Sequence, residues 1–193
     1  MYTIINNNKY VLEIKKSTFI ALLYKVDTTD QVNDYLKQAK LEYKDARHYC
    51  YAYIIDDKRK FSDDAEPGGT AGLPIIEVLN KHNLNYVLCI VVRYFGGIKL
   101  GVGGLVRAYT KAASNVIVQN NIVELMPGYE IKIVIDYDRQ KDLENIIKNT
   151  KYDKGFDEKV TYLIKCDLET LDKIKNNNIG YTIIKEIEII KKN

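Results

Sequence analysis

The stretch VVRYFGGIKLGVGGLVRAYTKAA, residues 91–113, decides the fold of this 193-residue chain. Its first residues end an apolar run over positions 86–95, which predicts a central strand covered on both faces. A glycine-rich segment follows, and apolar residues then recur at every third or fourth position, which predicts a helix over about 104–119. The stretch therefore predicts a strand, a glycine loop and a helix in succession.

Signals before this stretch predict the rest of the sheet and its covering helices. Runs of β-branched and aromatic residues are typical of strands, Thr28-Thr29 is typical of a helix cap, and Pro74 suits the first turn of a helix. The expected elements are strands at 9–14, 18–26 and 49–55, a helix ending near residue 43, a charged loop at 56–69 and a helix ending near residue 81.

A new pattern begins after Pro127-Gly128, where proline and glycine are expected to interrupt regular structure. We therefore expect two domains, 1–127 and 128–193, each with its own core. The second has the order β-α-β-β-α-β, the split βαβ or ferredoxin-like order, so the chain is predicted to be an α+β protein. Its expected elements are strands near 129–136, 150–156, 159–166 and 180–190 and helices near 138–149 and 168–177.

The composition excludes several classes of protein. Hydrophobic residues make up 46% and charged residues 28% of the chain, so a core can form and disorder is not expected. No apolar run approaches the ~20 residues that span a bilayer, and the N-terminus does not resemble a secretion signal, so no membrane partner is expected. Three cysteines without a CxxC pair fit a reducing cytosol and predict a cytoplasmic location.

Charge and glycine are unevenly distributed along the chain. The net charge is +3, and the stretch from Val78 to Val123 contains no Asp or Glu. Eight of the eleven glycines lie between Gly68 and Gly104, which indicates backbone that turns tightly or approaches a ligand closely. A functional centre is therefore expected between about residues 48 and 111.

The glycine loop lies between a strand and a helix, where backbone N–H groups can hold an anion. It lacks the GK[ST] sequence of a Walker loop. It also lacks the last glycine of a dinucleotide-binding fingerprint, because position 106 is Val. Arg107 falls in the first turns of the helix, where a cation is unfavourable unless an anion offsets it. The predicted anion- or nucleic-acid-binding set is Arg93, Lys99, Gly101, Gly103, Gly104, Arg107 and Lys111.

An acidic loop, FSDDAEPGG at residues 61–69, offers the opposite charge. In one interpretation the acidic residues of this loop pair with Arg93 and Arg107. In the other interpretation these arginines bind an anion. Both interpretations can hold if the arginines switch between the carboxylates and a bound anion. The adjacent acids lack an EF-hand pattern, so a solvated or Arg-paired loop is favoured over Mg²⁺, and no metal or cofactor is expected. The residues of this motif loop are Ser62, Asp63, Asp64, Glu66, Gly68, Gly69 and Thr70.

Two further patterns offer little chemistry. His48 and Cys50 share one face of a strand, roughly 6–7 Å apart, which is too far for direct proton transfer. The cysteines are therefore interpreted as structural, and no catalytic residue is predicted. Three tyrosines at positions 49, 51 and 53 also share a strand face, where they either bind unpaired bases or, as we favour, pack beneath helices.

Three runs together resemble the YigZ/IMPACT family: RHYCYAYI at 47–54, FSDDAEPGGTAGLPIIEVL at 61–79, and the stretch at 91–113. The resemblance spans about residues 18–117. It implies a ribosomal-protein-S5-domain-2-like N-terminal domain and a ferredoxin-like C-terminal domain, two types that occur side by side in elongation factor G. It also implies a regulatory, translation-linked protein with proposed nucleic-acid binding and no established catalytic activity.

The sequence departs from the family pattern at three positions. In the acidic loop Ala65 stands in place of a usual glycine and Gly69 in place of a usual small polar residue, and just after the loop Leu73 stands in place of a usual basic residue. The leading hypothesis is a non-catalytic module that binds RNA or the ribosome, with a translation factor or another protein as a further partner. The alternative is an enzyme on a phosphorylated small molecule that uses the glycine loop and a divalent metal held by the acidic loop. A third option is a protein-interaction module that uses the C-terminal sheet.

Overall fold

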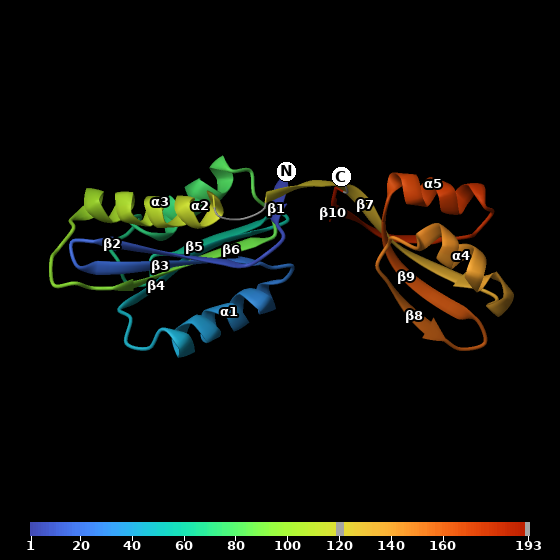
Figure 1. Cartoon of the computed structure of the whole chain (residues 1–193), viewed down its shortest axis with the longest axis horizontal. Helices are drawn as coiled ribbons and strands as arrows, with labels where there is room; N and C mark the ends of the chain where they lie inside the picture. Colours follow the sequence, from blue (N-terminus) through green and yellow to red (C-terminus); the bar gives the residue numbers. More distant parts are fainter. Residues whose placement is uncertain (119–121, 192–193) are drawn as a thin grey trace. The chain divides into compact units, whose positions relative to one another are not determined.

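An antiparallel sheet with the strand order β2-β3-β6-β4-β5 organises the first compact unit, Met1–Val123, of the computed structural model (Figure 1). The structure describes residues 1–118 and 122–191. The elements of this unit are β1 (Tyr2–Ile4), β2 (Asn8–Ile14), β3 (Ser17–Lys25), α1 (Thr29–Glu42), β4 (His48–Ile55), β5 (Lys58–Ser62), α2 (Gly72–Lys81), β6 (Val87–Tyr94) and α3 (Val102–Val118).

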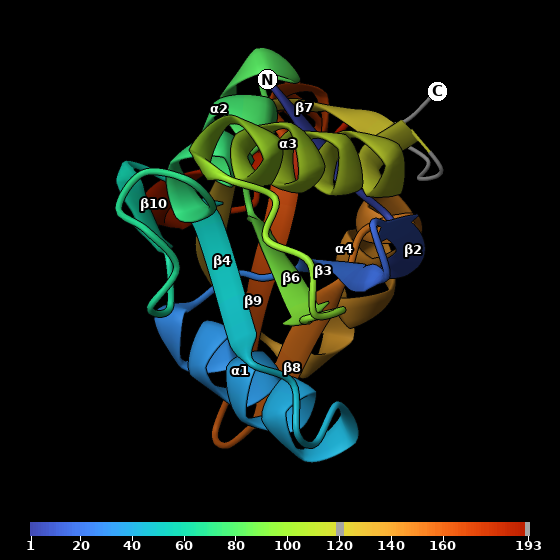
Figure 2. The same cartoon turned by 90° about the vertical axis from the view of Figure 1, so that its left-hand side faces the viewer.

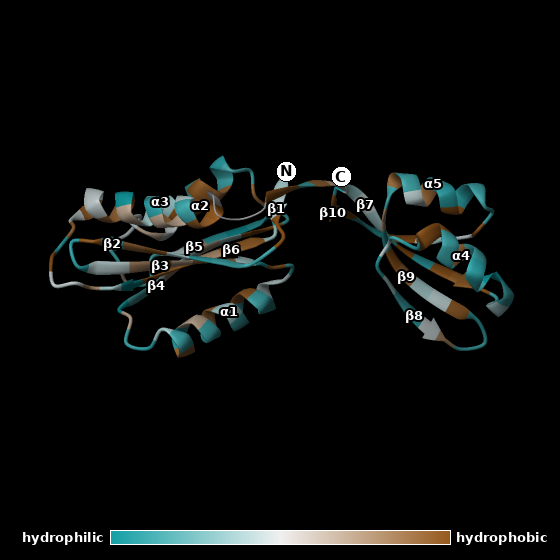
Figure 3. Ribbon diagram, in the orientation of Figure 1, coloured by the Kyte–Doolittle hydropathy of each residue, from teal (hydrophilic) through white to brown (hydrophobic). Residues whose placement is uncertain are grey.

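The apolar strand β6 is the central strand of this sheet, as its sequence predicts. It pairs with β3 on one side and β4 on the other, and all its residues except Tyr94 are buried. Helices α2 and α3 cover one face of the sheet and α1 covers the other (Figure 2). Because side chains alternate along a strand, Cys89 and Val91 pack beneath α2 and α3, while Ile90 packs beneath α1. Figure 3 shows hydrophobic residues on the strands between these helical layers.

The predicted cap of α1 is confirmed. The hydroxyl of Thr28 accepts a hydrogen bond from the Gln31 amide, and the Gln31 side chain accepts one from the Thr28 amide. This reciprocal arrangement satisfies amides that have no partner inside the helix. The side chains of Thr28 and Gln31 therefore fix where α1 begins.

The second compact unit, Glu124–Asn193, has the predicted order β-α-β-β-α-β. Its strands pair antiparallel in the order β10-β7-β9-β8, and buried residues of α4 and α5 join the core on one face of the sheet. Its elements are β7 (Ile122–Ile135), the short 3-10 helix η1 (Tyr137–Arg139), α4 (Gln140–Ile147), β8 (Tyr152–Phe156), β9 (Val160–Asp167), α5 (Leu168–Asn176) and β10 (Thr182–Ile190).

The prediction that Pro127-Gly128 interrupts regular structure is wrong, because both residues lie inside β7. Pro127 is paired with Glu188 of β10, but pairing of β7 with β9 begins only at Gly128, so on that side Pro127 lies at the end of the ladder, where a missing N–H is tolerated. A Cβ on Gly128 would lie 2.8 Å from the Cys166 carbonyl oxygen, so this glycine permits close backbone approach. The two compact units divide between Val123 and Glu124.

The predicted charged loop at 56–69 is partly a strand. Its first half forms β5, which pairs with β4 at the edge of the sheet, and most of β5 is exposed. An exposed edge strand carries charged residues and lacks the alternation of apolar and polar residues that predicts a strand, so its sequence resembles that of a loop. No helix in the described ranges is long and apolar enough to cross a membrane.

Candidate functional site

The acidic loop and the glycine loop meet at one end of the first sheet. The acidic loop connects β5 to α2, and the glycine loop connects β6 to α3. Strands β4 and β6 are neighbours, and His48 pairs across them with Arg93. The two motifs that the sequence separates therefore converge next to this cross-strand pair.

Glu66 is the carboxylate that joins the acidic loop to the strands and the helix on either side of the glycine loop. Its Oε1 lies 2.5 Å from Arg93 Nη1, accepts a hydrogen bond from the Tyr109 hydroxyl at 2.9 Å, and lies 3.8 Å from His48 Nε2. Glu66 and Arg93 are 8% and 5% exposed. The predicted contact between a motif-loop carboxylate and an arginine of the glycine stretch is thus confirmed.

His48 is fixed in one orientation by the acidic loop. Its Nδ1 lies 2.8 Å from the Asp64 carbonyl oxygen, which can only accept, so Nδ1 carries the proton. The other nitrogen, Nε2, is thereby left on the side of Glu66. The loop backbone thus selects the tautomer of a buried histidine.

A buried thiol and a buried phenol complete this cluster. The Cys50 thiol lies 3.4 Å from the Tyr109 hydroxyl and 3.0 Å from the Asp63 carbonyl oxygen. Burial raises the pKa of Cys50 to about 12, and burial also raises the pKa of Tyr109 far above its usual value. Both groups are therefore protonated at neutral pH, as the structural interpretation of the cysteines requires.

Asp63 and Asp64 hold the acidic loop in place. Asp63 accepts hydrogen bonds from the amides of Gly69, Ala71 and Gly72, at the start of α2, which has no side-chain cap of its own. Asp64 accepts a 2.6 Å hydrogen bond from the Tyr49 amide. These carboxylates therefore serve the protein backbone, and no group of three metal-binding side chains occurs within residues 1–118 and 122–191.

The remaining residues of the motif loop shape its backbone. The Ser62 hydroxyl accepts from the Asp64 amide, and the Thr70 hydroxyl donates to the Pro67 carbonyl. Gly69 has a φ of +76°, a conformation that glycine adopts without strain. A Cβ on Gly68 would meet no atom within 4 Å. These contacts assign local, structural roles to Ser62, Gly69 and Thr70.

A cleft of about 470 Å³ lies beside the Glu66–Arg93 pair. It is bounded by β4, β6, the acidic loop and the start of α3. Its polar and glycine residues include Arg47, His48, Glu66, Arg93, Lys99 and Gly101, and its apolar residues include Phe95 and Leu105. The lining thus carries three cationic side chains and one carboxylate.

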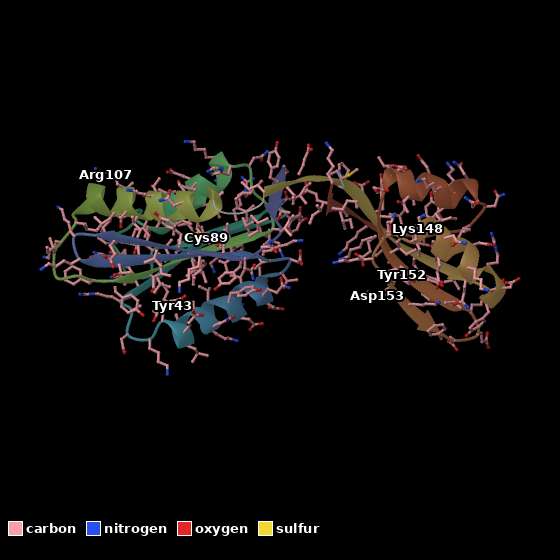
Figure 4. The ribbon with its side chains drawn as sticks, viewed as in Figure 1. Tyr43, Cys89, Arg107, Lys148, Tyr152 and Asp153 are labelled. Atoms are coloured by element: carbon pink, nitrogen blue, oxygen red, sulfur yellow. The ribbon has the colours of Figure 1, made fainter. Side chains whose placement is uncertain are left out.

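The structure divides the predicted anion-binding residues between this cleft and α3. Arg93, Lys99 and Gly101 line the cleft. Gly103 and Gly104 lie in the first turn of α3, and Arg107 and Lys111 are exposed further along it. Figure 4 shows Arg107 on the side of α3 that faces away from the sheet.

The Arg107 side chain lies back along its own helix. A Cβ placed on Gly103 would lie 3.4 Å from Arg107 Nη1, so the guanidinium lies over the first turn of its own helix. In the described ranges Arg107 forms no ion pair, so the interpretation that it pairs with the acidic loop is wrong, while the same interpretation of Arg93 is right.

Sequence reasoning missed Arg47 and Phe95. The guanidiniums of Arg47 and Arg93 each lie 5.6 Å from the Phe95 ring centroid, and the Arg47 amide donates to the Arg93 carbonyl. Arg47 is one of only five arginines among 29 basic residues, and it directly precedes β4. This scarcity of arginine was the available signal.

The tyrosine stripe and the other cysteines are structural, as predicted. Tyr53 is buried and Tyr49 and Tyr51 are partly buried in the core beneath α1. Cys89 is buried between the sheet and its covering helices (Figure 4), and burial raises its pKa to about 12 and that of Cys166 to about 11. The thiols of Cys89 and Cys166 are therefore protonated at neutral pH and are poor nucleophiles.

The departure at Ala65 has a visible backbone consequence. Ala65 has a φ of +65° and Asp64 a φ of +41°, and the left-handed region is costly for a residue with a side chain. Glycine adopts it freely, so the chain carries strain where the family pattern has glycine. Another departure, Leu73, lies 39% exposed in the first turn of α2.

Comparisons with known proteins match this geometry to one family. The family model "Impact N-terminal domain" matches residues 15–117, which include both loops and the cleft. A crystal structure titled as that of a hypothetical protein superposes with a TM-score of 0.72 at 27% identity, covering 94% of this chain and 95% of that one.

Relatives of known name agree. The IMPACT family member YvyE of Bacillus subtilis is 34% identical over 92% of this chain and 82% of its own length. The IMPACT family member YigZ of Escherichia coli is 36% identical over 71% of this chain and 70% of its own length. Human Protein IMPACT is 33% identical over 55% of this chain and 35% of its own length. This chain therefore belongs to the IMPACT family.

Proposed function

We propose that this IMPACT family member is a non-catalytic regulatory protein linked to translation that binds RNA, including RNA exposed on the ribosome. The binding surface, called here the basic surface, comprises Arg47, Lys99, Arg107 and Lys111 around the start of α3. None of these four side chains forms an ion pair with a carboxylate in the described ranges, and all are exposed. This unbalanced positive charge is the observation that carries the proposal.

Electrostatics around the basic surface favour a polyanion. The first turn of α3 contains no acidic residue, so its positive dipole end adds to the side-chain charges. Arg107 and Lys111 are four residues apart and share one face of the helix. A nucleic-acid backbone along that face would meet both cations and the helix start together, without any requirement for sequence-specific contacts.

An enzymatic role receives less support from the contacts. The metal-dependent alternative needs free carboxylates in the acidic loop, but Asp63 and Asp64 accept hydrogen bonds from backbone amides and Glu66 pairs with Arg93. A divalent ion would have to displace these donors. We therefore favour a binding function over phosphoryl chemistry.

Finer assignments accompany this proposal. We propose the S5-domain-2-like type for the first unit and the ferredoxin-like type for the second, whose strand order β10-β7-β9-β8 supports it. A cytoplasmic location follows from a role in translation, and the three cysteines, all free and buried, are compatible with it. A translation factor is the protein partner that the family's link to translation favours.

Direct binding tests the proposal. A fluorescent single-stranded 12-nucleotide oligouridylate is titrated with the protein at 50 to 200 mM salt, and co-sedimentation with ribosomes is measured in parallel. Contact of four cations with phosphates predicts a slope of log K against log salt of roughly −3, since each contributes about −0.7 on single strands. Absence of binding to both probes at 50 mM salt would overturn the proposal.

A further inference from the structure

We infer that the cleft at the start of α3 binds a phosphate monoester, carried either by the end of an RNA chain or by a free mononucleotide. The cleft is the 470 Å³ space lined by Arg47, His48, Arg93, Lys99 and Gly101. This inference rests on the proposed function for its RNA source and names the ligand group at that site.

Arg93 supplies the first observation. It is 5% exposed, its Nη1 is held by Glu66, and its guanidinium lies 5.3 Å from the Phe19 ring centroid. Its Nε is buried and has no hydrogen-bond acceptor among the described residues. A buried donor without an acceptor is costly, and the ion pair and the ring prevent the guanidinium from turning away. Arg93 also lines the cleft, so an oxyanion bound there would lie next to this guanidinium.

The start of α3 supplies a second, independent observation. The Gly101 carbonyl accepts the Leu105 amide, so the amides of the first turn before Leu105 have no acceptor within the helix. Gly101 has no side chain that could cap them, and Gly101 and Val102 both line the cleft. Free amides at the positive end of a helix are suited to phosphate oxygens.

The charge of the lining selects a monoester over a diester. Arg93 and Glu66 neutralise each other, which leaves the positive charges of Arg47 and Lys99 when His48 is neutral. A phosphate monoester carries roughly −1.5 to −2 at pH 7, whereas each internal phosphate of RNA carries a single negative charge. The cleft therefore matches a terminal phosphate, and the outer face of α3 matches internal ones.

The size and apolar part of the cleft fit a nucleotide attached to that phosphate. Its volume lies within the range of about 300–1,000 Å³ that is usual for small-molecule sites. Phe95, Leu100 and Leu105 line it beside the cations. The exposed guanidinium of Arg47, which lies 5.6 Å from the Phe95 ring centroid, offers a plane on which a base can stack.

Calorimetric titration with matched oligonucleotides tests the inference. The probes are three 12-nucleotide oligouridylates, with a 5′-phosphate, with a 3′-phosphate or with hydroxyls at both ends, together with uridine 5′-monophosphate. We expect one phosphorylated oligomer to bind about tenfold more tightly than the hydroxyl-ended oligomer. The exposed-residue variant Arg47→Ala/Lys99→Ala is expected to lose this preference. Lys37→Ala/Lys44→Ala, which removes two exposed cations in and just after α1, is expected to keep it.

The outcomes separate this inference from the proposed function. Preference for one phosphorylated end identifies RNA as the source, whereas binding of the mononucleotide without any oligomer supports the monoester site and overturns RNA binding. Equal affinity for all three oligomers, with no binding of the mononucleotide, overturns the monoester site and leaves RNA binding intact. Preference that survives in the Arg47→Ala/Lys99→Ala variant overturns the assignment to this cleft.

Discussion

Glu66 and Arg93, which are 27 positions apart in the sequence, form a buried ion pair with 2.5 Å between Oε1 and Nη1. The pair joins the acidic loop to the central strand β6 beside the cleft. It also leaves Glu66 as an acceptor for the Tyr109 hydroxyl on α3. One carboxylate therefore connects three elements of the site: the acidic loop, β6 and α3.

Removing the charge of Glu66 is expected to destabilise the first unit strongly. In Glu66→Gln the guanidinium of Arg93 remains buried without its counter-ion, and loss of one partner of a buried pair costs about 3–5 kcal/mol. Urea unfolding followed by circular dichroism measures the loss.

A matched control is the exposed pair of Glu169 and Lys173, four residues apart on α5, with side chains that are 77% and 57% exposed. Glu169→Gln is expected to cost less than about 1 kcal/mol, because solvent screens the pair. Equal effects of the two substitutions would show that the Glu66–Arg93 pair is not desolvated in solution.

Asp63→Ala is expected to cost about 2 kcal/mol, because one amide of the acidic loop and two amides at the start of α2 lose their charged acceptor. Asp57→Ala, at an exposed position in the turn between β4 and β5, serves as the control and is expected to change stability by less than about 0.5 kcal/mol. The free energy of unfolding in urea gives both values, and a neutral Asp63→Ala would refute the capping role.

Ala65→Gly is expected to stabilise the protein by about 0.5–1 kcal/mol. The gain comes from release of left-handed strain at a φ of +65°, reduced by the greater freedom of glycine in the unfolded chain. Gly69→Ala, at a φ of +76°, is the converse change and is expected to destabilise by about 1 kcal/mol. Thermal unfolding should show a higher midpoint temperature for Ala65→Gly and a lower one for Gly69→Ala than for the wild type. Midpoints that shift in the same direction would contradict the strain argument.

The three buried thiols are expected to resist alkylation. With its pKa raised to about 12, Cys50 is a thiolate in fewer than about one in a thousand folded molecules at pH 8.5. Mass spectrometry after iodoacetamide treatment should show no label on the native protein and three labels after unfolding. Rapid labelling of native Cys50 would contradict its burial.

The same shift predicts a loss of stability in alkaline solution. The folded state of Cys50 holds its proton up to about pH 12, whereas the unfolded thiol loses it near pH 9.0. A raised pKa stabilises the fold below pH 9, and this contribution is lost as the pH rises toward 12. The unfolding midpoint in urea should therefore fall more steeply above pH 9 in the wild type than in Cys50→Ser.

The sequence was sufficient to predict most of the fold because its signals are local. Strand β6 is apolar over its length and is central, and Thr28 with Gln31 forms the cap that begins α1. The exceptions are places where tertiary contacts override local preference. Pro127 and Gly128 lie in a strand, because a ladder begins there and a neighbouring backbone approaches closely.

The candidate site was only partly predictable from the sequence. The meeting of the two motif loops followed from complementary charge, and Glu66 and Arg93 confirm it. The separate roles of the acidic residues could not be predicted. Nothing in the sequence distinguishes Glu66, which pairs with arginine, from Asp63, which caps a helix. Arg47 joins the cleft through strand pairing, which a single sequence does not display.

The central claim, that the basic surface contacts RNA phosphates, is tested most directly by the salt dependence of RNA binding in Arg107→Ala/Lys111→Ala. Both residues are exposed on α3, so folding should be unaffected, and Lys37→Ala/Lys44→Ala provides the matched control. We predict that the α3 variant binds the 12-nucleotide oligouridylate more weakly by about 1–2 kcal/mol, with a slope of log K against log salt that is flatter by one to two units. A slope and an affinity identical to those of the wild type would contradict the account.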